Sequence, residues 1–167
     1  MATTALWKIK GRLDHVLDYA GNEDKTKNPE FTASEFQGLR DVMNYTYQDF
    51  KTEKQHYVSG INCDPEIARQ QMIDTKNQYR KTGGIIAFHG YQSFKEGEVT
   101  PELAHEIGMK LAREMWGDRF EVVVATHLDK KHIHNHFVLN SVSFADGYKY
   151  YSNYENTDRF RIKSDRI

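Results

Sequence analysis

The spacing of hydrophobic and polar positions changes several times along the chain, and each change predicts a new element. Apolar side chains that alternate with polar ones, or form short continuous runs, predict strands. Apolar side chains spaced three and four residues apart predict helices instead. The predicted strands are residues 5–10, 55–63, 83–94, 119–128 and 132–144. The predicted helices cover residues 13–20, 33–50, 65–79 and 101–116, and a polar helix begins after a turn at Asp146-Gly147.

Two proline-containing dipeptides indicate where helices start. Asp64 precedes Pro65 and Thr100 precedes Pro101, and a capping side chain followed by proline is typical of a helix N-terminus. Gly117 is placed to end the helix that starts at Pro101. We expect Leu103 and Leu111 of this helix to face the core.

The connection between the last two predicted strands sets the fold class. Only residues 128–131 join them, which is too short for a parallel crossover, so the pair must form an antiparallel hairpin. We expect one α+β domain over residues 1–167, with a mainly antiparallel sheet and helices packed on one face.

Composition narrows the class of protein further. The 167 residues suffice for one domain, and no apolar run approaches the length of a membrane span. The single cysteine, Cys63, excludes an internal disulfide. A net charge of −1 argues against a non-specific nucleic-acid coat but leaves room for an enzyme with a local basic groove.

The segment "HLDKKHIHNHFVLN" contains the most distinctive chemistry in the chain. Alternate residues of a strand share a face, so His132, His134 and His136 should project together, with His127 close by across the hairpin. Converging neutral imidazoles are costly to bury without a shared cation and make a site for a divalent metal. Asp129 can fix the tautomer of a ligand histidine by accepting its hydrogen bond.

Such a metal supports two kinds of chemistry. It can activate water for hydrolysis, with Asp129 or Glu98 as general base, or it can polarise a phosphodiester that a protein side chain attacks.

Three segments resemble the conjugative relaxases, mobilisation nucleases of the HUH endonuclease superfamily. His127, Asp129, His134, His136 and Asn140 match the third motif of that family. The segment around Ser93 resembles the second motif, and "RLDHVLDYAGNEDKT", which contains Arg12 and Tyr19, resembles the first. The resemblance implies an HUH endonuclease-like sheet, derived from the ferredoxin-like arrangement.

The resemblance also implies an activity and its residues. Tyr19 would attack a DNA phosphate at an origin of transfer and remain joined to the 5′ end. His127, His134 and His136 would bind one divalent cation, with Asp129 and Asn140 supporting them, and His132 would act as base or positioning group. Manganese or magnesium is expected, although imidazole ligands also suit zinc, nickel and copper.

The same family implies partners and a setting. The substrate would be single-stranded or hairpin DNA, and an accessory relaxosome protein and a coupling protein would assist in the bacterial cytoplasm, with no membrane contact. Because the chain stops within a predicted helix, we expect residues 1–167 to be the N-terminal part of a longer protein.

Aromatic and basic side chains suggest where DNA would bind. The candidates beside Ser93 are Arg12, Lys130, Lys131, Lys149, Tyr150, Arg159 and Arg161. Tyr45 lies in a segment that aligns with that of Tyr19, so it is the reserve nucleophile. Three alternatives stay open: a replication-initiator nuclease, a metal-dependent phosphodiesterase or other hydrolase without a covalent step, and a metal-stabilised binding module.

Overall fold

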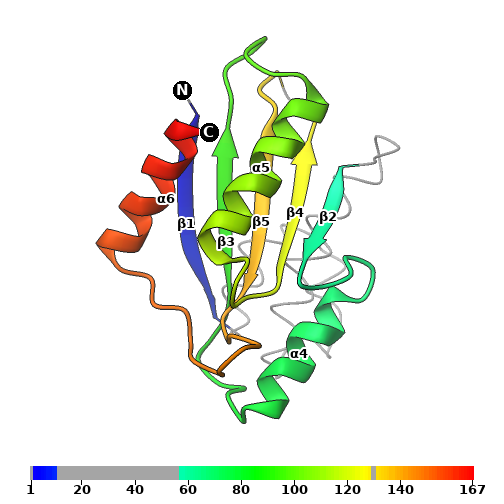
Figure 1. Cartoon of the computed structure of the whole chain (residues 1–167), viewed down its shortest axis with the longest axis vertical. Helices are drawn as coiled ribbons and strands as arrows, with labels where there is room; N and C mark the ends of the chain where they lie inside the picture. Colours follow the sequence, from blue (N-terminus) through cyan, green and yellow to red (C-terminus); the bar gives the residue numbers. More distant parts are fainter. Residues whose placement is uncertain (1, 11–56, 129–130) are drawn as a thin grey trace, which may run out of the picture.

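A computed structural model describes residues 2–10, 57–128 and 131–167 (Figure 1). The helices predicted over 13–20 and 33–50 lie outside these residues. The described strands are β1 (Thr3–Lys10), β2 (Val58–Ile61), β3 (Ile85–Ser93), β4 (Val122–His127) and β5 (His134–Asn140). The described helices are α4 (Ala68–Gln78), α5 (Pro101–Trp116) and α6 (Tyr154–Arg166).

The strands form one sheet in the order β1-β3-β5-β4-β2, and every neighbouring pair is antiparallel. The predicted α+β class and the predicted hairpin between β4 and β5 are both confirmed. The neighbouring interior strands β5 and β4 are buried along their whole length. The side chains on β4 and β5 are therefore held in place by well-packed strands.

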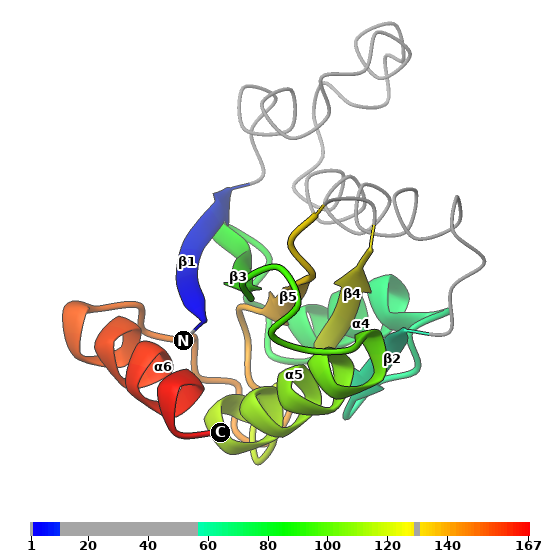
Figure 2. The same cartoon turned by 90° about the horizontal axis from the view of Figure 1, so that it is seen from above.

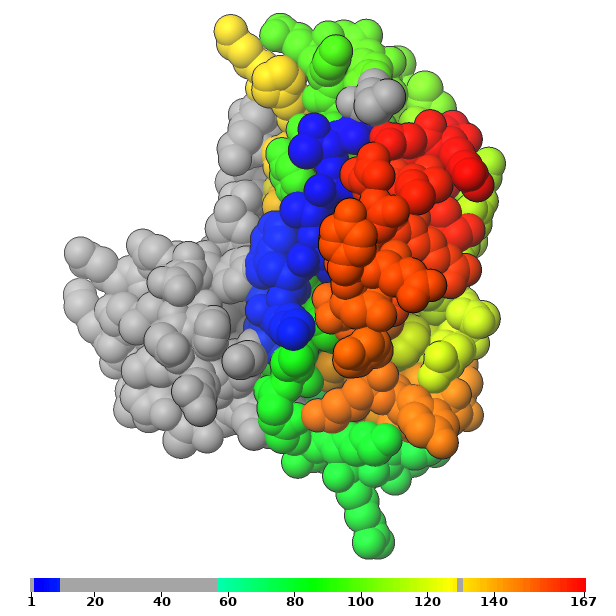
Figure 3. Space-filling view, turned by 90° about the vertical axis from the view of Figure 1, so that its left-hand side faces the viewer, coloured from blue at the N-terminus to red at the C-terminus, as the bar shows by residue number. Residues whose placement is uncertain are grey.

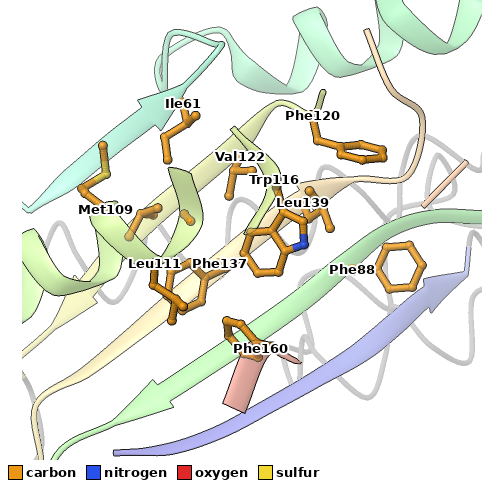
Figure 4. Packing of buried hydrophobic residues seen from close by; sticks show 12 residues of the cluster. Ile61, Phe88, Met109, Leu111, Trp116, Phe120, Val122, Phe137, Leu139 and Phe160 are labelled. Carbon is orange, nitrogen blue, oxygen red and sulfur yellow. The ribbon is translucent and has the colours of Figure 1, made fainter. Parts of the chain in front are cut away.

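The sheet is packed on both faces, so the expectation of helices on one face is wrong. On one face a buried cluster joins Trp116 of α5 and Phe160 of α6 to Phe88 and Phe137 of the sheet (Figure 4). On the other face Met72 and Ile73 of α4 pack with strand residues such as Val138. Successive strand residues point to opposite faces, which explains why Phe137 and Val138 belong to different clusters.

Local capping explains where α5 begins. The Thr100 hydroxyl accepts a hydrogen bond from the backbone N–H of Leu103 at 3.2 Å, Pro101 is the first helical residue, and Gly117 caps the C-terminus. Leu103, expected in the core, is instead 44% exposed. The buried face of α5 begins with Ala104 and includes Gly108 and Ala112, small residues that let the helix approach the sheet closely.

The predicted start of α4 is also wrong. Asp64 and Pro65 belong to a turn, in which the Asp64 carboxylate accepts a hydrogen bond from the backbone N–H of Glu66 at 2.9 Å. The helix begins at Ala68. An aspartate that bonds its own backbone two residues on forms a turn as readily as a helix cap, so the sequence signal was ambiguous.

The helix α6 lies beside α5 on one side of the sheet (Figure 2). It also runs along the edge strand β1, and the two elements are neighbours on the molecular surface (Figure 3). Within the described residues, no helix is both long enough and apolar enough to cross a bilayer.

Candidate metal centre

The hairpin of β4 and β5 brings three histidines together. His127 is the last residue of β4 and His134 is the first of β5, and the antiparallel register pairs them directly. His136 lies two residues further along β5, on the same face. All three are buried, and one ring nitrogen from each lies within 4.8 Å of the others. The structure thus assembles the three residues that the sequence predicted as ligands.

The tautomer of His134 is fixed by the backbone. Its Nδ1 lies 2.9 Å from the carbonyl oxygen of His132. A carbonyl can only accept, so Nδ1 carries the proton and Nε2 keeps a lone pair. A metal ligand needs such a lone pair.

His132 itself is not on the strand. Residues 131–133 form a bend and a coil before β5, and the His132 side chain is exposed. The expectation that it projects from the strand beside His134 and His136 is therefore wrong. Its place in the site comes from its backbone carbonyl, because β5 starts two residues later than predicted.

A fourth histidine, which the sequence did not single out, supports the cluster. His89 of β3 is 1% exposed, and its Nε2 lies 2.8 Å from Nδ1 of His136. Burial, and after it the charge of His127, lower the pKa of His89 to about 3. His89 belongs to a predicted strand, but only the strand order shows that β3 lies beside β5.

The donor set fits a divalent cation. Three imidazoles come from rigid strands, and the Nδ1 atoms of His134 and His136 already have hydrogen-bonding partners. Each of these rings can then offer Nε2, as ligand histidines with an outer hydrogen bond do. Three protein ligands leave coordination positions for a substrate oxygen.

Ser93 lies in the same row of the sheet as two of the histidines. It pairs with His134 in the β3–β5 register, and His134 pairs with His127 in the β4–β5 register. Tyr91, two residues earlier, has its ring centroid 5.5 Å from that of His134 and 5.7 Å from that of His136. On β1, Trp7 is 38% exposed, and its ring centroid lies 4.7 Å from that of His89. Polar and aromatic groups thus border the histidines.

Asn140 lies elsewhere, in a buried network beneath α4. Its amide donates to the Glu121 carboxylate at 2.8 Å and to the backbone carbonyl of Met72 at 3.3 Å, and its oxygen accepts from Lys76. Thr75 donates to the other oxygen of the same carboxylate at 2.6 Å. Both ends of the amide are therefore used by this network, rather than in support of a ligand histidine as the sequence predicted.

Burial changes the acid–base properties of this network. It lowers the pKa of the Lys76 ammonium to about 7, against the opposing attraction of Glu121, and it raises the pKa of Glu121. Sequence reasoning missed both Lys76 and Glu121. In the case of Lys76 the reason is that it lies in a polar stretch of α4 that resembles a solvated face.

Two of the expected DNA contacts of the C-terminal segment, Tyr150 and Arg161, lie on the other face of the sheet. The Tyr150 ring packs against Phe88 and Trp116 in the cluster under α5, so it is not a free stacking surface. Arg161 is paired with Asp158. The structure does not bring these side chains to the histidines.

Four further candidates can be placed in the described chain. Lys149 donates to the Gly83 carbonyl at 2.7 Å, and Arg159 is exposed at a cavity of about 420 Å³ beside α5 and α6. Lys131 is exposed in the segment that leads into β5. Glu98 accepts a hydrogen bond from the backbone N–H of Lys95 within the loop before α5. The remaining candidates lie outside the described residues: Arg12, Tyr19, Tyr45, Asp129 and Lys130.

A chain of polar side chains crosses the sheet on the face opposite the histidines. Thr126, Asn135 and Gln92 occupy one row of β4, β5 and β3, and hydrogen bonds of 2.6 and 2.9 Å join them. His105 of α5 extends the chain from Thr126 to Ser59 of β2, with both contacts at 2.8 Å. Because these residues alternate with the histidines along β4 and β5, their side chains point away from the candidate metal site.

The residues His127, His134 and His136 form a cluster of three histidines that can hold a divalent cation, on the antiparallel sheet of an α+β domain. Residues 42–167 match the family described as "Relaxase: MobA/VirD2-like, nuclease domain", so the chain belongs to that family of nuclease domains.

Two curated relatives support the same family assignment. The chain is 40% identical to a protein rlx of Staphylococcus aureus over 119 residues, which are 71% of this chain and 37% of the relative. It is 30% identical to the group II intron-interrupted relaxase LtrB of Lactococcus lactis subsp. cremoris over 139 residues, 81% of this chain and 24% of that protein. The matched part of the chain thus covers 37% or less of these relatives' own length. No solved structure matches it.

Proposed function

We propose that the chain is the nicking domain of a relaxase, which cuts and rejoins one DNA strand at an origin of transfer. The observation that carries this proposal is the convergence of His127, His134 and His136, within 4.8 Å, in a chain of the relaxase nuclease family. The relatives named relaxase support the same activity.

The reaction is a transesterification. The Tyr19 hydroxyl oxygen attacks the scissile phosphorus, a tyrosine O–P bond forms, and the P–O3′ bond breaks. The products are a 5′-phosphotyrosine and a free 3′-hydroxyl, which receives a proton, and the reverse step reseals the strand. When bound by the three histidines, a divalent cation would supply stabilisation of the charge that develops on the phosphate.

A base must accept the phenol proton, because a tyrosine hydroxyl is almost fully protonated at neutral pH. His132 is the candidate, and its exposed side chain directly before β5 supports the role. Tyr45 stays the alternative nucleophile. The family match begins at residue 42, so it includes Tyr45 but not Tyr19; the choice of Tyr19 rests on the first motif.

The DNA strand would lie over the histidine face. Ser93 is in register with His134, and the rings of Tyr91 and Trp7 border the same site. Phosphate contacts combined with stacked aromatic rings are typical of single-strand binding. In the sequence, Lys130 and Lys131 come shortly before β5, whereas the 147–166 segment offers an alternative path on the other face.

The remaining parts of the proposal come from the family. Manganese or magnesium would be the working cation, with zinc, nickel and copper as competitors for imidazole ligands. Accessory relaxosome and coupling proteins would assist in the bacterial cytoplasm, and the enzyme would travel with the strand to which it is joined.

The test uses single-stranded oligonucleotides tiled across the DNA that flanks the gene for this chain. With Mn²⁺ or Mg²⁺, we expect one oligonucleotide to be cut and to form a protein–DNA adduct that survives denaturing electrophoresis. EDTA and His134→Ala should abolish both products, with the fold of the variant checked by circular dichroism.

Other outcomes support the alternatives. Cleavage without an adduct would indicate a phosphodiesterase. Metal-dependent folding with no cleavage would indicate a binding module. Cutting confined to an origin of replication would indicate an initiator nuclease.

A further inference from the structure

We propose that His89 is a positioning residue of the metal centre: its Nε2 accepts a hydrogen bond from Nδ1–H of His136, which directs Nε2 of His136 to the cation. The proposal rests on the proposed function, because it takes His136 to be a ligand. Its central observation is the 2.8 Å contact between the two rings.

The direction of this hydrogen bond follows from what a ligand requires. A neutral imidazole has one N–H and one lone pair. If His136 offers the Nε2 lone pair to a cation, its proton is on Nδ1, the atom that faces His89. His89 must then be the acceptor at Nε2 and carry its own proton on Nδ1.

Packing holds the acceptor in place. His89 is 1% exposed, and its ring is stacked on that of His136, with centroids 4.9 Å apart and an interplanar angle of 28°. On the other side its ring centroid is 4.7 Å from that of Trp7, which is opposite His89 in the β1–β3 register. The side chain is therefore fixed by strands on both sides of β3.

The chemical nature of the acceptor matters as much as its position. A carboxylate in this place would place a negative charge beside the ligand and reduce the net positive charge of the centre. An imidazole orients His136 without that charge, as the backbone carbonyl of His132 does for His134. Two of the three ligands are thus held by neutral acceptors, so the charge of a bound cation stays available to a phosphate oxygen.

Metal binding tests this role without using activity. Calorimetry measures the affinity of the whole 167-residue chain for Mn²⁺ and Co²⁺, and the visible spectrum of cobalt reports on its ligands. His89→Phe keeps a ring but removes the acceptor. His89→Gln places an amide oxygen near the position of Nε2, so it can still accept. His105→Phe is the matched control, because it removes a buried imidazole with hydrogen bonds to Ser59 and Thr126 on the other face.

We expect His89→Phe to weaken metal binding by about 10–100-fold, the usual effect of removing an outer partner of a ligand. His89→Gln should recover most of the affinity, and His105→Phe should leave it unchanged. In the wild-type chain loaded with Zn²⁺, nitrogen-15 spectra should show His136 protonated at Nδ1.

Each of the other possible results overturns a defined part of the proposal. Equal affinity in the wild type and in His89→Phe overturns the positioning role. Equal losses in His89→Phe and His89→Gln show that an acceptor at this position does not restore binding, which overturns the role of the hydrogen bond. Equal losses in His89→Phe and His105→Phe show a general loss of stability. If the wild type itself binds neither metal, the proposed metal centre fails before the question of His89 arises.

Discussion

The amide of Asn135 lies directly against Gly108: a β-carbon on Gly108 would be 2.5 Å from Nδ2 of Asn135. That amide donates to Gln92 at 2.9 Å and to the backbone carbonyl of Ala104 at 2.8 Å. The close approach of α5 to the sheet thus depends on Gly108, which has no side chain. This packing holds β5, the strand that carries His134 and His136.

Gly108→Ala should therefore destabilise the domain, although alanine normally stabilises a helix by about 1 kcal/mol relative to glycine. The added methyl must displace a buried amide and break its hydrogen bonds, which costs about 1–3 kcal/mol. Urea unfolding measures the change. Glu106→Ala, at an exposed position of the same helix, is the control and should change stability little. A stabilised Gly108→Ala variant would show that α5 does not pack on Asn135.

The buried Lys76 should make stability rise with pH just above neutrality. Its pKa is about 7 in the folded chain and near 10.5 when exposed, so between these values the unfolded state binds more protons. We expect the free energy of unfolding to increase by about 1–2 kcal/mol from pH 7 to 8.5.

Two other groups oppose this trend. Glu121, whose pKa is raised, loses its stabilising effect as pH rises through its folded value. Cys63, with its pKa raised to about 12, lowers stability only above about pH 9. Lys76→Met should flatten the rise, and Lys110→Met, at an exposed position of α5, should keep it. The same slope in all three chains would contradict a buried, weakly basic Lys76.

The DNA path can be tested with two aromatic residues on different faces. Trp7 borders the histidines, whereas Tyr151 is 73% exposed before α6. Trp7→Ala should weaken binding of single-stranded DNA by about 1–3 kcal/mol through loss of stacking, and Tyr151→Ala should have no effect. Fluorescence anisotropy in EDTA measures binding separately from metal occupancy. The reverse result would place the strand along the 147–166 segment.

The sequence predicted what depends on local spacing. The alternation of His134, His136 and Phe137 placed the ligands and the core on opposite faces of β5, and four connecting residues were enough to predict the hairpin that adds His127. The cap at Thr100 could be recognised for the same reason.

The sequence did not predict contacts between distant strands. His89 meets His136 only because β3 lies beside β5 in the sheet order, and Asn140 meets Lys76 only because α4 covers that end of the sheet. Tyr150 was expected at a DNA surface because aromatic and basic residues surround it, yet its ring completes the core under α5.

The most direct test of the central claim is the identity of the tyrosine that becomes joined to DNA. After reaction with the oligonucleotide that is cut, trypsin digestion and mass spectrometry locate the nucleotide on a peptide. We expect it on the peptide Leu13–Lys25, which contains Tyr19, and we expect no adduct in Tyr19→Phe. Recovery on the peptide Asp41–Lys51, which contains Tyr45, or an undiminished adduct in Tyr19→Phe, would contradict the account.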